Sequence, residues 1–109
     1  MAGAKIVVLY PQPKDVAEFE RAYAQDHVPM VDSAKMGGLS RFVATRFVGT
    51  PTGEAPPFYR MAELHFSSLQ LLQECAQTEH TQKTVQHAIS ISTGGPPVFM
   101  VAEEETQTF

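Results

Sequence analysis

The chain has 109 residues, of which 43% are apolar and 18% are charged, and its formal net charge is −4. This length and composition predict a single globular domain over residues 1–109 and exclude a disordered or collagen-like chain. Three of the twelve acidic residues lie at positions 103–105. The rest of the chain is therefore almost neutral, and we expect no nucleic acid partner, since such a partner needs a basic surface.

The N-terminal segment and the cysteine content give expectations about location. The apolar run at residues 6–10 is too short for a signal peptide or a membrane span. Cys75 is the one cysteine of the chain, so it cannot form an internal disulfide, which is typical of reducing compartments. We therefore expect a cytoplasmic protein with no membrane partner.

The first third of the chain predicts a strand followed by a helix. Residues 5–10 are rich in β-branched side chains and precede a Pro-Gln-Pro segment, which cannot continue a sheet ladder. From Lys14 onward, apolar residues recur every three or four positions, the spacing of one helix face. These residues are Val16, Phe19, Tyr23, His27 and Met30. We expect a kink near Pro29, because proline removes a backbone donor, and an end to the helical region at residues 37–38.

The middle of the chain predicts two strands. Residues 40–48 and 58–66 both alternate between apolar and polar side chains. A loop rich in glycine and proline, residues 49–57, joins them. This loop is longer than a tight hairpin turn, and loops of this kind are often mobile.

The last third predicts a helical region and a final strand. Ser67 and Gln70 have the spacing of a capping box, so a helix should begin there. The helix can restart at Thr78 or Glu79 before a Gly-Gly-Pro-Pro segment ends it. Residues 98–102 are apolar and form the predicted fourth strand.

The order of these elements is β-α-β-β-α-β. It predicts an α+β, ferredoxin-like fold in which both helices cover one face of a four-stranded antiparallel sheet. The first and last strands are apolar on both faces, and such strands need cover on both sides. Because the helices cover one face only, we expect a homodimer packed sheet against sheet.

His27 is the first candidate for chemistry. It shares a helical face with Phe19 and Tyr23 and should therefore point at the sheet. An imidazole in such a place can act as a tuned acid or base. The other interpretation is a core histidine whose ring bonds a backbone carbonyl near Pro29. The residues alone leave both interpretations open.

The strand at residues 58–66 carries a second group of candidates. By the two-residue repeat, one of its faces holds Tyr59, Met61, Glu63 and His65. If that face lines a cavity, Glu63 could orient His65 or raise its pKa. The alternative is that Glu63 pairs with Arg41 or Arg46 across strands or across subunits.

No pattern predicts a metal or a cofactor. His80 and His87 are seven residues apart, too far for chelation from adjacent helical turns, and we expect both on the solvent face of their helix. Cys75 has the surroundings of a small buried apolar residue. The sequence contains no phosphate-binding glycine motif and no G-x-S-x-G segment. We therefore expect neither a metal nor a cofactor.

Residues 5–31, KIVVLYPQPKDVAEFERAYAQDHVPMV, resemble the opening of the EthD family of dimeric α+β barrel proteins. The similar features are the Leu-Tyr-Pro end of the first strand, the helix start at residues 15–19 and the His-Val-Pro-Met segment. GLSR at 38–41, MAELHF at 61–66 and SSL at 67–69 are similar too. The resemblance covers about residues 5–103 and implies a homodimeric α+β barrel.

The resemblance also implies a pocket between the sheet and the helices for a small, often aromatic, molecule. The wider superfamily includes cofactor-independent monooxygenases, polyketide cyclases, muconolactone isomerases and haem-degrading enzymes, and several members use a histidine with a tyrosine as acid and base. His27 matches the family position. The expected catalytic residues are His27, Tyr23, Glu63 and His65, and the expected substrate-binding residues are Phe19, Tyr59 and Met61.

Three functions are compatible with these features. The first is an oxygenase, isomerase or cyclase that acts without a cofactor on an apolar or aromatic catabolic metabolite. The second is a non-catalytic binding protein for a hydrophobic metabolite. The third is an interaction module whose main feature is the dimer. Fold alone does not choose between them.

Overall fold

The computed structural model describes residues 3–109 of the chain. Its centre is a four-stranded sheet with the order β2-β3-β1-β4. The strands are β1 (Gly3–Tyr10), β2 (Leu39–Arg46), β3 (Arg60–Phe66) and β4 (Val98–Glu104). Every neighbouring pair is antiparallel. The predicted α+β fold with a four-stranded antiparallel sheet is confirmed.

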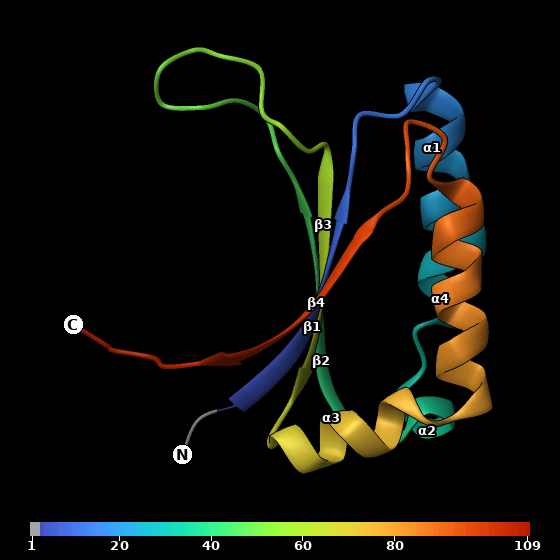
Figure 1. Cartoon of the computed structure of the whole chain (residues 1–109), viewed down its shortest axis with the longest axis vertical. Coiled ribbons are helices and arrows are strands. Elements are labelled where there is room, and N and C mark those ends of the chain that lie inside the picture. The colour runs from blue at the N-terminus through green and yellow to red at the C-terminus, as the bar shows by residue number, and fades with distance from the viewer. Residues whose placement is uncertain (1–2) are drawn as a thin grey trace.

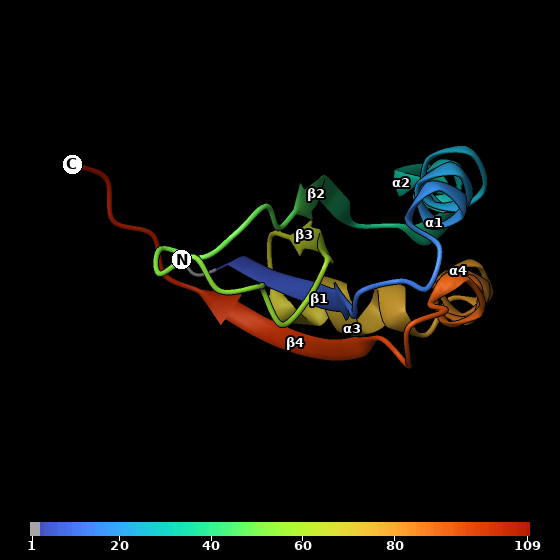
Figure 2. The ribbon, with the colours of Figure 1, turned by 90° about the horizontal axis from the view of Figure 1, so that it is seen from above.

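The helices lie on one face of this sheet (Figure 1). They are α1 (Val16–Ala22), the π-helix η1 (Tyr23–His27), the 3-10 helix η2 (Val28–Met30), α2 (Ser33–Met36), α3 (Leu69–Ala76) and α4 (Glu79–Ile91). Seen from above, α1 and α4 stand together on one side, and the C-terminal residues extend on the other (Figure 2). One face of the sheet is therefore free of helices, as the element order predicts.

The first helical region changes its winding before Pro29. Asp15 caps α1, because its carboxylate accepts a hydrogen bond from the Glu18 backbone N–H at 3.0 Å. The Val28 N–H then bonds the Tyr23 carbonyl five residues back, which makes the wide turn of η1. Pro29 has no N–H to continue the ladder, and a 3-10 turn follows. The predicted kink near Pro29 is confirmed.

The helix boundaries differ from the predictions in two places. Ser68, not Ser67, caps α3, because its hydroxyl accepts the Leu71 N–H, so the predicted cap is wrong by one residue. The short helix α2 was outside the predictions. Asp32 starts it by accepting two backbone N–H groups. The predicted restart is confirmed, since Thr78 caps α4.

The two faces of the sheet differ in their cover. The face toward the helices forms the core and carries Ala4, Ile6, Val8, Tyr10, Phe42, Ala62, Leu64, Phe66 and Phe99. The other face, here called the open face, carries Lys5, Val7, Leu9, Val43, Met61, Glu63, His65, Val98, Met100 and Glu104. Val98 and Met100 are 40% and 46% exposed on the protomer. The apolar residues of β4 on this face are thus exposed on the protomer, whereas Val7 of β1 is 8% exposed.

Gly94 lies where the segment after α4 crosses the segment after β1, and we expect alanine there to destabilise the fold. A Cβ atom at Gly94 would run into the Gln12 carbonyl oxygen and lie 2.8 Å from its carbon. Backbone atoms cannot turn aside as a side chain can, so Gly94→Ala should cost about 2 kcal/mol or more. The melting temperature should fall by about 8 °C or more.

Thermal unfolding measures this effect, and Gly49→Ala is the matched control. A Cβ atom at Gly49 meets nothing within 4 Å, so this variant should melt within about 2 °C of the wild type. Equal melting temperatures for the two variants would contradict the crossing described here.

Candidate functional site

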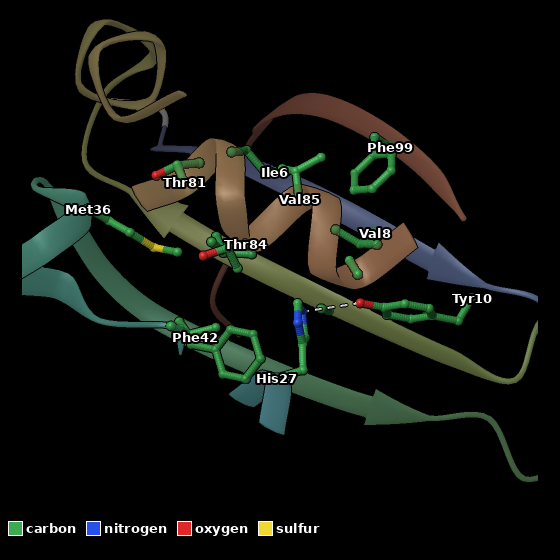
Figure 3. Close-up of a pocket in the computed structure, with 14 residues that line it drawn as sticks. Ile6, Val8, Tyr10, His27, Met36, Phe42, Thr81, Thr84, Val85 and Phe99 are labelled. Atoms are coloured by element: carbon green, nitrogen blue, oxygen red, sulfur yellow. Dashed lines mark hydrogen bonds between the residues drawn. The ribbon is translucent and has the colours of Figure 1, made fainter. Parts of the chain in front are cut away.

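A hollow lies between the sheet and α4 (Figure 3). Its lining is mostly apolar and consists of Ile6, Val8, Tyr10, His27, Val31, Met36, Phe42, Ala62, Leu64, Thr81, Thr84, Val85, Ala88 and Phe99. The hollow is partly open to solvent, and its cavity volume is about 30 Å³. This is room for about two water molecules. A larger ligand must displace lining side chains, and Phe99, 37% exposed, is placed to move.

His27 enters this hollow from the wide turn of η1. The turn keeps Tyr23 and His27 together, with their ring centroids 5.8 Å apart. The His27 side chain is 5% exposed and points between the sheet and α4 (Figure 3). π-Helical turns are rare and are frequent at functional sites. The local winding thus places an ionisable ring in an apolar setting.

Two side chains contact the His27 ring nitrogens. Nε2 lies 3.4 Å from the hydroxyl oxygen of Tyr10, and Nδ1 lies 2.9 Å from Nδ1 of His87. The two imidazole planes differ by 11°, and their centroids are 5.1 Å apart. Because the centroids are so much farther apart than the nitrogens, the rings lie edge to edge. One ring therefore donates an in-plane hydrogen bond to the other.

Burial sets the protonation states of this group. Burial, with a smaller effect of His87, lowers the pKa of His27 to about 4. Burial also raises the pKa of Tyr10 well above its ordinary value, helped by the nearby Tyr23. Near neutral pH, His27 is therefore neutral, and the Tyr10 hydroxyl keeps its proton.

Acid should destabilise the wild-type protein more than a His27→Gln variant. In the unfolded chain His27 titrates near 6.5, and in the folded protein at about 4. Between these values only the unfolded chain takes up the proton, so the free energy of unfolding falls as the pH drops from 6.5 to 4. The loss from this group is about 3 kcal/mol.

Urea unfolding at pH 7 and pH 4 measures this loss. The other titrating groups are common to the two proteins, so the difference between their pH dependences reports on His27 and its contact with His87. Identical pH dependences would show that His27 is as easily protonated in the folded protein as in the unfolded chain.

Tyr23 and Phe19 support His27 from behind. Both are 2% exposed, and their rings stack with centroids 5.6 Å apart. Burial raises the pKa of Tyr23 to about 12, so its hydroxyl stays protonated. This hydroxyl has no hydrogen-bond partner among residues 3–109. The two predicted residues pack behind the histidine and do not line the hollow.

Tyr59, the residue before β3, forms a hydrogen bond to α1. Its hydroxyl donates to the Glu20 carboxylate at 2.6 Å, and Arg60 donates to the other Glu20 oxygen at 2.9 Å. The Arg60 guanidinium also lies 4.6 Å from the centroid of the Tyr23 ring. These contacts hold the helix that carries His27 against the sheet.

Met61, Glu63 and His65 lie on the open face, away from His27. The Glu63 carboxylate accepts a hydrogen bond from Lys5 Nζ at 2.6 Å, so within the protomer Glu63 pairs with Lys5 and not with Arg41 or Arg46. Lys5 and Arg41 both stand opposite His65, on the two strands that flank β3, and Lys5 is the cation that reaches the Glu63 carboxylate. Arg46 stands opposite Arg60, on the other face of the sheet.

The His65 ring is 5% exposed and has acidic neighbours on this face. Its Nδ1 lies 3.4 Å from a Glu104 oxygen, and its Nε2 lies 3.7 Å from a Glu63 oxygen. Nε2 forms no hydrogen bond with the described part of the chain. The sheet thus divides the predicted catalytic residues into two groups, His27 with Tyr23 and Glu63 with His65.

His80 and His87 do not lie on a solvent face, so that prediction is wrong. His80 Nε2 lies 2.6 Å from the Met30 carbonyl oxygen, and His87 meets His27. The buried side of α4 carries Thr81, Thr84 and Ala88, whereas Ile89 is 43% exposed. The buried side of α4 thus includes polar side chains, and His87 reaches His27 from this helix.

Tyr10 and His87 are the site residues that sequence reasoning missed. Tyr10 is the last residue of β1, and strand alternation places it on the face of Val8, which was the available signal. One of the two interpretations of His27 gave its ring a backbone carbonyl as partner, and the structure shows two side chains in its place.

Within residues 3–109, no helix is long and apolar enough to cross a bilayer. In the same part of the chain, no three His, Cys, Asp or Glu side chains are arranged to hold a metal ion.

Comparison with known proteins gives a consistent set of relatives. The EthD domain model matches residues 11–88. An uncharacterized 11.0 kDa protein in the thcB-thcC intergenic region of Rhodococcus erythropolis is 25% identical over 100 residues, which cover 92% of this chain and 94% of that protein. The crystal structure of an EthD family protein from Bacillus halodurans has a TM-score of 0.83 and 31% identity, covering 96% of this chain and 100% of that chain.

More distant structures share the fold. A dimeric ferredoxin-like protein of unknown function from Jannaschia has a TM-score of 0.68 at 13% identity, covering 95% of this chain and 99% of that chain. SnoaB, a cofactor-independent oxygenase from Streptomyces nogalater, has a TM-score of 0.58 at 12% identity, covering 98% and 95%. The ferredoxin-like fold is thereby confirmed. Since the family model spans most of the chain, this protein belongs to the EthD family.

Proposed function

We propose that this chain is an enzyme that removes a proton beside the carbonyl group of a small apolar molecule, without a bound cofactor. The observation that carries the proposal is the position of His27. Its Nε2 borders an apolar hollow and lies next to a tyrosine hydroxyl instead of a backbone carbonyl. Family membership and the likeness to a cofactor-independent oxygenase support the same class of function.

His27 acts as the base in this proposal, and Tyr10 stabilises the product of the proton transfer. The 3.4 Å between Tyr10 Oη and His27 Nε2 is long for a hydrogen bond. A substrate oxygen can therefore compete for the Tyr10 hydroxyl. Because that hydroxyl stays protonated, it can donate to the oxygen as the substrate becomes an enolate.

The lining defines the class of substrate. Apart from Tyr10 and His27, its polar side chains are Thr81 and Thr84, so the ligand is mostly apolar with one or two oxygens. A base with a pKa of about 4 is weak, so the carbon that loses the proton must be unusually acidic. Carbons between a carbonyl and a double bond meet this requirement. Isomerisation, cyclisation and oxygenation can all start with this step.

The functional unit of this proposal is a homodimer joined through the open face. Val98 and Met100 expose apolar surface there, and two of the similar structures are described as dimeric. In this arrangement Glu63, His65 and Met61 belong to the subunit contact. Phe19, Tyr23 and Tyr59 hold the helix that carries His27.

Turnover of cyclohex-3-enone tests the proposal. This small ring ketone has an acidic carbon between its carbonyl and its double bond, and its isomer cyclohex-2-enone absorbs at longer wavelength. We expect the protein to convert one into the other at a rate that saturates with ketone concentration. Native mass spectrometry of freshly purified protein gives the assembly mass and shows any retained small molecule.

Other outcomes identify the alternative functions. Ketones that raise the melting temperature without being converted would indicate a binding protein for hydrophobic metabolites. A protein that neither binds nor converts a panel of small cyclic ketones would indicate an interaction module. Either result would overturn the proposed activity.

A further inference from the structure

We infer that His87 forms a proton relay with His27 and carries positive charge from the hollow to solvent, an inference that rests on the proposed function. The two Nδ1 atoms are 2.9 Å apart, and the ring planes differ by 11°. An N–H on one ring therefore points at the lone pair of the other. His27 is 5% exposed, whereas His87 is partly exposed on α4.

The relay answers a difficulty in the proposed chemistry. A proton taken up by His27 alone would leave an imidazolium in an apolar hollow, which burial strongly disfavours. If His27 passes its other proton to His87, the charge reaches a ring that water can hydrate. His27 can then act as a base without keeping the charge.

The transfer can be followed atom by atom from a resting state in which both rings are neutral. His27 carries its proton on Nδ1 and donates to His87 Nδ1, and His87 carries its proton on Nε2. When His27 Nε2 takes the proton from the substrate carbon, His27 Nδ1 gives its proton to His87 Nδ1. His87 Nε2 then releases its proton to water. Both rings end neutral, and the enolate keeps the electron pair of the broken C–H bond.

The end state restricts the reaction class. After the transfer each ring holds its proton on the opposite nitrogen, so neither ring can repeat the step. The relay resets when His27 Nε2 returns its proton to the substrate, His87 Nδ1 passes its proton back to His27 Nδ1, and His87 Nε2 regains one from water. This favours reactions that return the proton to another atom of the same molecule, such as isomerisation and cyclisation.

Nuclear magnetic resonance of the full chain labelled with ¹⁵N-histidine tests the relay without a substrate. We expect long-range spectra at pH 7 to show His27 protonated on Nδ1 and unprotonated on Nε2. Asparagine can place an amide near the position of a histidine Nδ1 but cannot pass on a proton. In His87→Asn, exchange of the His27 Nδ1 proton with water should therefore slow at least tenfold.

His80→Gln is the matched control, because His80 lies on the same helix and bonds the Met30 carbonyl outside the hollow. It should leave the exchange rate unchanged. A resting His27 protonated on Nε2, or an unchanged exchange rate in His87→Asn, would overturn the relay. If His87→Asn does not fold, His87→Gln, which also carries an amide that cannot pass on a proton, gives the same comparison.

Turnover separates the relay from the proposed function. With cyclohex-3-enone, kcat of His87→Asn should fall at least tenfold with KM unchanged, and imidazole in the buffer should restore part of it. Slowed proton exchange without conversion of the ketone would uphold the relay and refute the proposed function. Full kcat in His87→Asn would refute the relay and leave the proposed function standing.

Discussion

Replacing His27 by glutamine should lower kcat/KM for the isomerisation of cyclohex-3-enone by about a hundredfold to ten-thousandfold. Glutamine can place an amide near the position of Nε2, so it fills the space and can still bond Tyr10, but it cannot accept the substrate proton. The loss should therefore appear in kcat more than in KM. Steady-state absorbance kinetics measure both constants.

The control for this prediction is His80→Gln, the same substitution outside the hollow. The new side chain can still donate to the Met30 carbonyl that His80 contacts, so this variant should keep wild-type activity. A folded His27→Gln protein that retains more than a tenth of the wild-type kcat would show that His27 is not the base.

A carboxylate at position 100 should convert the proposed dimer into monomers. Met100 lies on the open face and is 46% exposed on the protomer, so Met100→Asp should leave the protomer fold intact. In the dimer two such carboxylates would be buried without a partner, each at a cost of several kcal/mol. We expect the dissociation constant to rise at least a hundredfold, since about 1.4 kcal/mol corresponds to a factor of ten.

Sedimentation velocity over a range of concentrations measures this change, and Ile89→Asp is the matched control. Ile89 is 43% exposed but lies on α4, on the helical side of the molecule. That variant should remain dimeric. If Met100→Asp remains dimeric as well, the subunits do not join through the open face.

The strands and their order could be predicted because their signals are local. Each strand is a run of apolar or alternating residues closed by glycine, proline or a helix cap, and the order of the elements along the chain predicts the ferredoxin-like sheet. The short helix α2 was harder to predict, because four residues carry too little periodicity to show. The predicted cap of α3, Ser67, is one residue before the actual cap, Ser68, because either of two adjacent serine hydroxyls can accept a backbone N–H at a helix start.

The candidate site was only partly predictable. The inward position of His27 could be predicted from the helical face that it shares with Phe19 and Tyr23, and its burial beside the hollow agrees with that prediction. His87 was not found, because histidines on an amphipathic helix are expected on its solvent face, whereas the buried side of α4 includes the polar residues Thr81 and Thr84. The separation of His27 from Glu63 and His65 depends on which face of the sheet the helices cover, and a two-residue repeat within one strand cannot decide that.

The alternation of β1 couples the two surfaces of the molecule. Val8 and Tyr10 border the hollow, whereas Val7 and Leu9 belong to the open face, so one strand is shared by the ligand site and the proposed subunit contact. A ligand that shifts this strand must alter the contact as well. Thermodynamic reciprocity then requires that any factor by which the ligand strengthens subunit association is the factor by which association strengthens ligand binding.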